Sequence, residues 1–292
     1  MPRLRSTSHW SDPREKPLYG AAEIHHGHQL APKFLFLLNE AAGTPYELKT
    51  GINGSVATIF AGDSGARWVT AANGQAFFFN HTIGSQYHSI DLSAFASRLT
   101  IAAPFSVEAW WDWQGSGTKG DFSGPVNCRT SSYPGFQMVD VQGSTDRYRP
   151  ALEIWNGTTD TNAASGATTY LRPFNKRFLW TWDGSTAVLY TNGVPDGATS
   201  MGAGGYASPI ATTNLGGGYK QIAGNLVRVV IWSRVLSASE ALGVYHLPYI
   251  FLRPIIRRRY FAPPAAPAAP SAGVFIQERI GQGIGRGVLA GR

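Results

Sequence analysis

Two carboxylates in the run FSVEAWWDW are the first residues whose types could support catalysis. A pair of carboxylates can hydrolyse a glycosidic bond with retention when about 5–5.5 Å separates them. Glu108 and Asp112 are four positions apart, which corresponds to about 13 Å along a β-strand, and Trp110 lies between them on the same face. We therefore expect both carboxylates on an outer, solvated face, and we expect no catalytic pair.

Other residues that could bind a metal or act as nucleophiles do not form a recognisable motif. The single cysteine, Cys128, lies in a Gly/Ser-rich stretch without a histidine at catalytic spacing, and no Ser-His-Asp pattern stands out. His25, His26 and His28 could offer imidazole nitrogens, but no set of cysteines or carboxylates accompanies them, which favours surface histidines. The sequence therefore predicts a protein that is not an enzyme.

The net charge of +7 is concentrated at the end of the chain. Residues 251–292 hold seven arginines and one acidic residue, whereas residues 31–250 hold 14 basic and 14 acidic residues. Prolines 263, 264, 267 and 270 exclude an amphipathic membrane helix and favour an extended spacer. The arginines form one dense cluster next to an aromatic pair, which favours a protein partner over nucleic acid. No apolar run is long enough for a membrane span.

Glycines occupy every second position in the run IGQGIGRG near the end of the chain. One face of such an extended segment is bare backbone, which another chain can approach closely. We therefore expect this C-terminal arm to bind a partner. The expected contact residues are Arg253, Arg257, Arg258, Arg259, Tyr260, Phe261, Ile280, Ile284 and Arg286.

The middle of the chain shows the alternation and turn signals of antiparallel β-structure. Asn73-Gly74 and Asp183-Gly184 each separate two apolar runs, which predicts two hairpins. A helical period follows at SASEALGVYHL, where Ser237 and Glu240 form a capping box. The pattern predicts an all-β, two-sheet antiparallel sandwich with one short C-terminal helix and extended terminal arms.

These signals divide the chain into four parts. We expect an N-terminal arm at residues 1–30 and a sandwich at residues 31–248. A basic, proline-rich strap follows at residues 249–272, and a Gly-rich C-terminal arm occupies residues 273–292.

Four runs, in order, carry a resemblance to a known family. The most specific are WTWDGSTAVLYTNGVPDG and IAGNLVRVVIWSRVLSASEALGVY, and FLFLLNEAAGTPYELKTGINGSV and FSVEAWW precede them. Together they resemble laminin G-like domains of the concanavalin A-like lectin/glucanase superfamily. The resemblance implies a jelly-roll-like sandwich. It does not imply one function, because this superfamily contains enzymes, lectins and structural modules.

The resemblance also suggests two kinds of rim site. Laminin G-like domains often hold calcium near one rim. The matching segment here offers Glu47 and Asn53 as weak candidate ligands. We therefore expect no cofactor, with calcium binding as the open alternative. Lectins of this fold bind sugar through rim loops that combine aromatic, amide and carboxylate side chains. The candidate loops are 114–135 and 156–170. The candidate sugar-binding residues are Phe122, Tyr133, Asn156, Asp160 and Asn162.

The run YHLPYIFLRPIIRRRYF is similar to the endings of many phage-encoded proteins of this superfamily. We therefore interpret the chain first as a phage virion structural protein, made in the host cytoplasm. In this interpretation it is a capsid decoration (cement) protein and a homo-oligomer, and its arms bind neighbouring subunits such as the major capsid protein. The alternative is a lectin-like tail, fibre or head-spike component that contacts host glycan. Neither nucleic acid nor a membrane is an expected partner.

Overall fold

The computed structural model describes most of the central part of the chain. The described residues are 22–25, 27–40, 45–49, 52–53, 55–58, 67–71, 74–79, 88–92, 103–113, 124–130, 133–140, 147–155, 160–171, 173–201, 214–215 and 224–254. Residues 1–255 form one compact unit, and residues 256–292 form a second one that lies outside the described residues.

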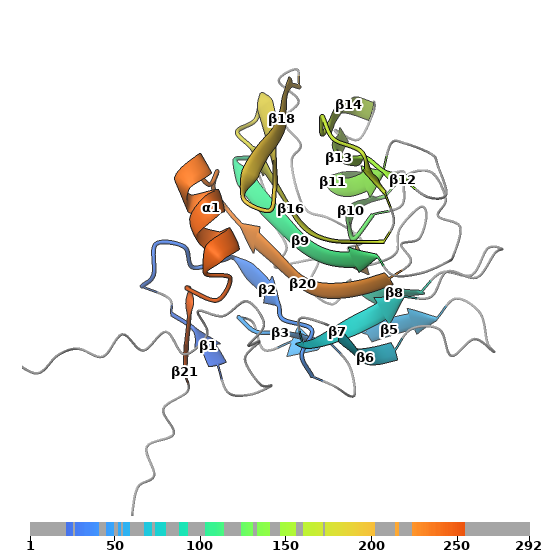
Figure 1. The fold of residues 1–292 in the computed structure, drawn as a ribbon, viewed down its shortest axis with the longest axis vertical. Helices are drawn as coiled ribbons and strands as arrows, with labels where there is room; N and C mark the ends of the chain where they lie inside the picture. Colours follow the sequence, from blue (N-terminus) through green and yellow to red (C-terminus); the bar gives the residue numbers. More distant parts are fainter. Residues whose placement is uncertain are drawn as a thin grey trace, which may run out of the picture. The chain divides into compact units, whose positions relative to one another are not determined.

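Two antiparallel sheets form the body of the first unit (Figure 1). In the described part of the chain, the larger sheet has ten strands. Its order is β18 (Val194–Ser200), β17 (Thr186–Thr191), β16 (Phe174–Trp182), β9 (Phe105–Trp113), β20 (Gly224–Trp232), β2 (Phe34–Phe36), β3 (Tyr46–Glu47) and β4 (Ile52–Asn53), with β7 (Gly74–Phe79) beside β20 and β6 (Arg67–Ala71) beside β7.

The smaller sheet has seven strands among the described residues. Its order is β14 (Asp160–Ser165), β13 (Pro150–Trp155), β11 (Tyr133–Asp140), β10 (Val126–Thr130), β19 (Asn214–Leu215), β8 (His88–Asp91) and β5 (Ser55–Thr58). Two short ribbons pair β12 (Arg147–Tyr148) with β15 (Tyr170–Leu171) and β1 (Ala22–Ile24) with β21 (Leu252–Pro254). The predicted all-β, two-sheet sandwich is confirmed.

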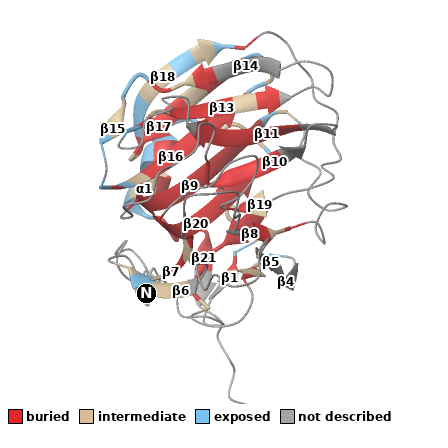
Figure 2. Ribbon diagram, turned by 90° about the vertical axis from the view of Figure 1, so that its right-hand side faces the viewer, coloured by how far each residue is buried: buried red, intermediate tan, exposed pale blue. Residues whose placement is uncertain are grey.

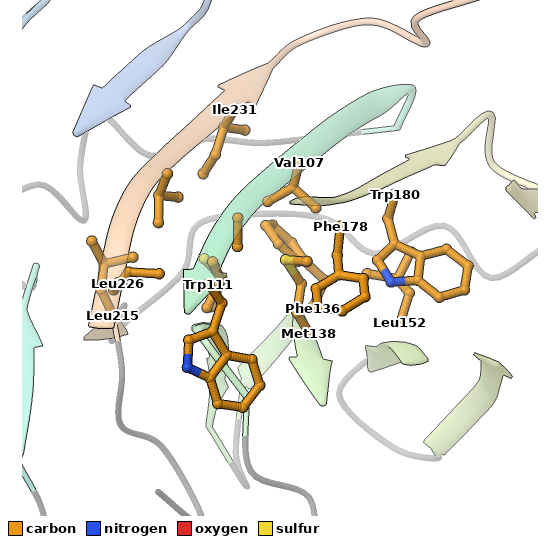
Figure 3. Close-up of a cluster of buried hydrophobic side chains, with 14 of the residues drawn as sticks. Val107, Trp111, Phe136, Met138, Leu152, Phe178, Trp180, Leu215, Leu226 and Ile231 are labelled. Carbon is orange, nitrogen blue, oxygen red and sulfur yellow. The ribbon is translucent and has the colours of Figure 1, made fainter. Parts of the chain in front are cut away.

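The main core lies between the inner faces of the two sheets (Figure 3). Alternation places the odd-numbered residues of β9, Phe105 to Trp113, in this core, as the sequence predicts. Phe105 stacks on Phe136 of β11 with 4.6 Å between ring centroids. Trp111 and Trp180 lie in the same cluster as Met138 and Leu152 of the smaller sheet.

Glycine turns close the predicted hairpins. Asp183-Gly184 joins β16 to β17, and the Asp183 carboxylate accepts hydrogen bonds from the backbone N–H groups of Ser185 and Thr186 at 2.7 Å each. Asn192 and Gly193 have φ values of 52° and 78° between β17 and β18, as a tight two-residue hairpin turn requires. The β6–β7 hairpin also forms, although Asn73 itself lies outside the described residues.

The outer face of β9 corrects one expectation from the sequence. Glu108 and Asp112 are 3% and 2% exposed, not solvated, because helix α1 (Ala238–His246) and the residues that follow it help to cover this side of the large sheet. A second apolar cluster joins Leu179 and Val230 of the sheet to Val244 of α1 and to Phe251. Figure 2 shows the resulting burial along β16, β9 and β20.

Helix α1 begins at the predicted capping box. The Ser237 hydroxyl accepts from the Glu240 N–H at 3.3 Å, and the Glu240 carboxylate accepts from the Ser237 N–H at 2.8 Å. Arg234 donates to the same carboxylate at 2.7 Å, and this bond with the cap holds the Glu240 pKa at about 2. In the described part of the chain, no helix is long and apolar enough to cross a membrane.

The β1–β21 ribbon continues the packing beyond residues 31–248. Ile24, Phe251 and Leu252 belong to the second apolar cluster, and the His25 N–H donates to the Phe251 carbonyl at 2.8 Å. Segments that the sequence analysis assigns to the arms therefore pack on the sandwich as far as residue 22 at one end and residue 254 at the other.

Candidate carbohydrate-binding rim

Two of the predicted sugar-binding residues come to the same end of the smaller sheet. Tyr133 begins β11 and pairs with Thr130 across the 131–132 turn. Gly135, two residues further along, pairs with Trp155, which in turn pairs with Asp160 across the 156–159 turn. Strand spacing and rise place the Cα atoms of Tyr133 and Asp160 about 12 Å apart. The strand ends that flank residues 131–132 and 156–159 thus meet at one rim, which we call the turn rim.

The polar pair Gln137–Glu153 lies on the outer face of the sheet, inward from the turn rim along the same strands. Phe136 and Met138 of β11 and Ile154 of β13 belong to the main core, so the alternate positions belong to the opposite face. On that face the Gln137 amide donates to the Glu153 carboxylate. By the same alternation, Trp155 occupies a position of the outer face. The register shift between the Cys128–Phe136 and Thr130–Tyr133 pairs interrupts the alternation before Tyr133.

Trp155 was not among the residues predicted from the sequence. It is the last residue of β13 and directly precedes the 156–159 turn, and the run WNG was the available signal, an aromatic residue followed by turn residues. Asn162, in contrast, is the extra residue of a β-bulge in edge strand β14, between the Ile154–Thr161 and Glu153–Ala163 pairs. Asn156 lies outside the described residues.

The inclusion of Phe122 in this group stays a prediction. Phe122 itself lies outside the described residues, as does all of the segment 114–123. That segment leads into Gly124, which lies against the Met138 carbonyl, and Val126 pairs with Met138. Met138 is about 17 Å along β11 from Tyr133 at 3.4 Å per residue. The proposed loops 114–135 and 156–170 also contain strands β10 and β14, so they are not continuous loops.

A carboxylate at the other end of β14 is already saturated by internal hydrogen bonds. Asp196 of β18 accepts from the backbone N–H and hydroxyl of Thr168 through Oδ1, and from the hydroxyls of Tyr170 and Thr191 through Oδ2, at 2.5–3.2 Å. Burial and the bond to Asp196 raise the Tyr170 pKa to about 12. The Ala167 N–H also donates to the Asp196 carbonyl at 2.6 Å. This residue therefore fastens the edges of the two sheets together and has little capacity left for a ligand.

Glu47 has a structural role in the early segment proposed for calcium. It is fully buried, and its Oε1 accepts from the backbone N–H groups of Leu35 at 2.8 Å and Lys49 at 3.1 Å. Asn53 pairs with Tyr46, and Glu47 pairs with Ile52, on adjacent short strands. Among the described residues, no group of three or more His, Cys, Asp or Glu side chains is arranged to hold a metal ion.

The two carboxylates of β9 are engaged in buried polar contacts. Glu108 forms an ion pair with Arg228, which also donates to the Pro248 carbonyl. Asp112 accepts from the Asn225 amide at 3.1 Å. Neither carboxylate reaches the solvent, so neither is placed to attack or protonate a bound sugar.

A second buried arginine binds the end of helix α1. Arg177 donates to the Tyr245 carbonyl at 2.7 Å, and its guanidinium lies 4.0 Å from the Trp110 ring centroid. Burial, together with the positive charge of Arg228, lowers the Arg177 pKa to about 10. Arg177 and Arg228 thus face one carboxylate, Glu108, and the helix-end carbonyls compensate the remaining charge.

Of the predicted partner-binding residues, the described part of the chain contains Arg253. It lies in β21, directly opposite Glu23 of β1, so its backbone belongs to the sandwich and not to a projecting arm. The others, from Arg257 to Arg286, lie outside the described residues.

Comparison with known proteins identifies the fold. The binding domain of Paraclostridial Mosquitocidal Protein 1 superposes with a TM-score of 0.51 and 13% identity, over 73% of this chain and 51% of that one. A structure of botulinum neurotoxin type C superposes with a TM-score of 0.50 and 8% identity, over 73% and 50%. The match thus spans about half of each of these proteins. Domain 4 of AbnA, an extracellular GH43 arabinanase from Geobacillus stearothermophilus, was solved in complex with arabinotriose. It superposes with a TM-score of 0.49 and 14% identity, over 77% of this chain and 99% of that one.

The family assignment rests on sequence. No curated protein matches the chain at a significant level. Residues 83–241, more than half of the chain, match the laminin G-like family, and this range includes β9, β16–β18, β20 and the first turn of α1. The chain belongs to the laminin G-like family of the Concanavalin A-like lectin/glucanases superfamily.

Proposed function

We propose that this protein is a lectin-like, carbohydrate-binding protein and that glycan binds at the turn rim. The observation that carries this proposal is the register of β10, β11, β13 and β14, which brings Tyr133, Trp155 and Asp160 to one end of the smaller sheet. Sugar sites combine aromatic surface with a few polar groups that fix orientation. The turn rim supplies both residue types.

The superposed proteins support binding as the type of function. The match to the mosquitocidal protein is to its binding domain. Botulinum neurotoxin type C depends on interaction with two ganglioside molecules to enter cells. At 13% and 8% identity these matches establish the fold, so the binding site has to be argued from the residues of this chain.

We propose binding without hydrolysis. A glycosidase of the retaining type needs two accessible carboxylates about 5–5.5 Å apart. Glu108 and Asp112 are buried and bonded to Arg228 and Asn225, respectively. The absence of hydrolysis can be checked by incubating the bound glycan with the protein and following the release of reducing ends.

A glycan microarray with the labelled full chain tests the proposal. We expect binding to a defined group of glycans. Trp155→Ala and Asp160→Asn should each weaken binding to these glycans at least tenfold, whereas Lys176→Ala, at the other end of the sandwich, should leave it unchanged. The proposal would be refuted if the array shows no binding, or if both rim variants bind as strongly as the unmodified chain. Circular dichroism of each variant shows whether the fold is retained.

The distribution of charge along the chain favours a second candidate function. In this function the protein is a phage capsid decoration protein that attaches to the major capsid protein. The basic residues in excess lie in the terminal segments, and the sandwich between them is neutral. Co-sedimentation with particles that lack the protein tests this function. A truncated form should end after Pro254, because Tyr249, Phe251 and Leu252 are buried in the sandwich. Binding of the truncated form as strong as that of the full chain would contradict attachment through the C-terminal arm.

A further inference from the structure

We propose that the turn at residues 27–31 is an acid-sensitive latch, which fastens strand β1 to the sandwich while the His28 imidazole is neutral and loosens when it takes up a proton. The observation that carries this proposal is the bond made by His28 Nδ1, which accepts the backbone N–H of Leu30 at 3.1 Å. A ring nitrogen can accept a hydrogen bond only while it carries no proton. Protonation of His28 therefore removes this bond. We call residues 27–31 the latch turn.

The latch turn connects β1 to the large sheet through backbone groups. The His28 N–H donates to the His25 carbonyl, and the His25 N–H donates to the Phe251 carbonyl, at 2.8 Å each. On the other side of the turn, the Leu30 carbonyl accepts the indole N–H of Trp232 at 2.9 Å. The bond that His28 controls thus lies within a series of hydrogen bonds that leads from the β1–β21 ribbon to strand β20.

The latch turn also keeps apolar side chains buried. Ile24 of β1 and Leu30 of the turn are 2% and 4% exposed, and both belong to the second apolar cluster together with Phe251. Strand β1 has only three residues, so its own ladder with β21 contributes few hydrogen bonds. The position of β1 on the sandwich therefore depends on this packing and on the bonds of the latch turn.

Charges near the latch turn oppose a proton on His28. The ring centroids of His25 and His28 are 6.2 Å apart, so two protonated rings repel each other. The guanidinium of Arg234, which forms an ion pair with Glu240, donates to the Gln29 carbonyl at 3.0 Å. His26 lies outside the described residues. The other charged groups on the flanking segments are Lys33, Lys49, the buried Glu47, and Glu23 and Arg253, which lie opposite each other in the ribbon.

The pKa of His28 shows the net effect of this environment. Burial, together with the repulsion from His25, lowers the pKa of His28 below its ordinary value of 6.5. Because the pKa is lower in the folded chain than in the unfolded chain, the stabilisation is fully present above pH 6.5 and is lost as the pH falls towards the folded pKa. The latch turn should therefore be closed at pH 7.5 and loosened at pH 5.

The same hydrogen bond argues against a metal site at His25 and His28. A neutral imidazole that accepts at Nδ1 carries its proton on Nε2, so the His28 ring has no second lone pair for a cation. The two histidines are thus better suited to sensing protons than to binding metal.

Amide hydrogen exchange measured by NMR tests the latch, with each rate divided by the intrinsic rate at the same pH. Between pH 7.5 and pH 5, the protection of the Leu30 N–H and of the Trp232 indole N–H should fall at least about tenfold. The Val107 N–H of the central strand β9 should stay within threefold and serves as the internal control. Protection of Leu30 at pH 5 that stays within threefold of its value at pH 7.5 would overturn the proposal.

Two substitutions show whether His28 is the group that titrates. The side-chain oxygen of asparagine can accept the N–H two residues further on, but it does not titrate, so His28→Asn should keep Leu30 protected at both pH values. His28→Ala has no acceptor and should leave Leu30 weakly protected at both. The proposal fails if His28→Asn loses protection at pH 5 as the unmodified chain does, or if His28→Ala keeps it at pH 7.5. An NMR titration that gives His28 a pKa of 6.5 or above would also contradict it.

Discussion

The buried ion pair between Glu108 and Arg228 gives the most quantitative prediction of the structure. Arg228 is 0% exposed and Glu108 is 3% exposed, and Arg177 contributes a second cation close to the pair. Glu108→Gln keeps the shape of the side chain but removes the anion. Breaking a buried pair by removing one partner costs about 3–5 kcal/mol, because the remaining charge stays buried. The Pro248 carbonyl and the Tyr249 ring, 5.5 Å from the guanidinium, remain as partners of Arg228, so we expect about 3 kcal/mol.

A paired substitution shows whether the cost comes from the unpaired charge. Glu108→Leu combined with Arg228→Met removes both charges, and the replacement of a whole buried ion pair by apolar residues is often neutral or stabilising. We therefore expect the double variant to unfold at a higher urea concentration than Glu108→Gln.

The free energy of unfolding of both variants can be measured by equilibrium urea unfolding followed by tryptophan fluorescence. The values can be compared if the free energy depends on urea concentration with the same slope in each protein. The reasoning is refuted if Glu108→Gln stays within about 0.5 kcal/mol of the unmodified protein, or if the double variant is the less stable of the two.

Three further predictions concern the elements around this pair. Gly193→Ala should destabilise the fold more than Gly184→Ala. Both glycines have positive φ, but a Cβ at residue 193 would lie 2.8 Å from the Tyr245 Cβ, whereas the atom nearest to a Cβ at residue 184 is 3.7 Å away. The thermal unfolding temperature should therefore be lower for Gly193→Ala than for Gly184→Ala. Glu240→Gln should cost about 1 kcal/mol at pH 7. Because the folded pKa of Glu240, about 2, lies below its ordinary value of 4.5, this stabilisation is present above pH 4.5 and is lost as the pH falls towards 2, so unfolding curves of the two proteins should converge at low pH. Phe251→Ala should cost about 3–5 kcal/mol in urea unfolding because the ring is fully buried against Trp232, and a loss below 1 kcal/mol would mean that the ribbon is not packed as described.

The period-two pattern of β9 predicts its inner face correctly but not its outer face. Residues Phe105 to Trp113 alternate between core and outer positions. This alternation can be predicted because it follows from the local geometry of a β-strand. Part of the covering of the outer face comes from residues 236–252, about 130 positions later, and a local pattern contains no information about such distant contacts. One signal was available: Glu108 and Arg228 are opposite charges in two largely apolar strands, which indicates a buried pair if the strands are neighbours.

The turn rim could be predicted in part for a similar reason. The turns after Thr130 and Trp155 are visible as polar and glycine-containing runs between apolar ones. Which turns meet depends on the strand order β14-β13-β11-β10, and this order is a property of the whole sheet. Sequence alone therefore proposed Tyr133 and Asp160 among the candidates without their strand pairing, whereas the register brings both to one end of the smaller sheet and adds Trp155.

Locating bound glycan on the sandwich is the decisive experiment for glycan binding at the turn rim. Backbone amide chemical shifts can be followed by NMR while a glycan selected on the array is titrated into the full chain. We predict that the saturable shift changes cluster at Tyr133, Gly135, Trp155 and Asp160, and that Thr168 and Asp196 at the opposite end remain unaffected. Saturable changes centred on Thr168 and Asp196, or no saturable changes at all, would contradict it.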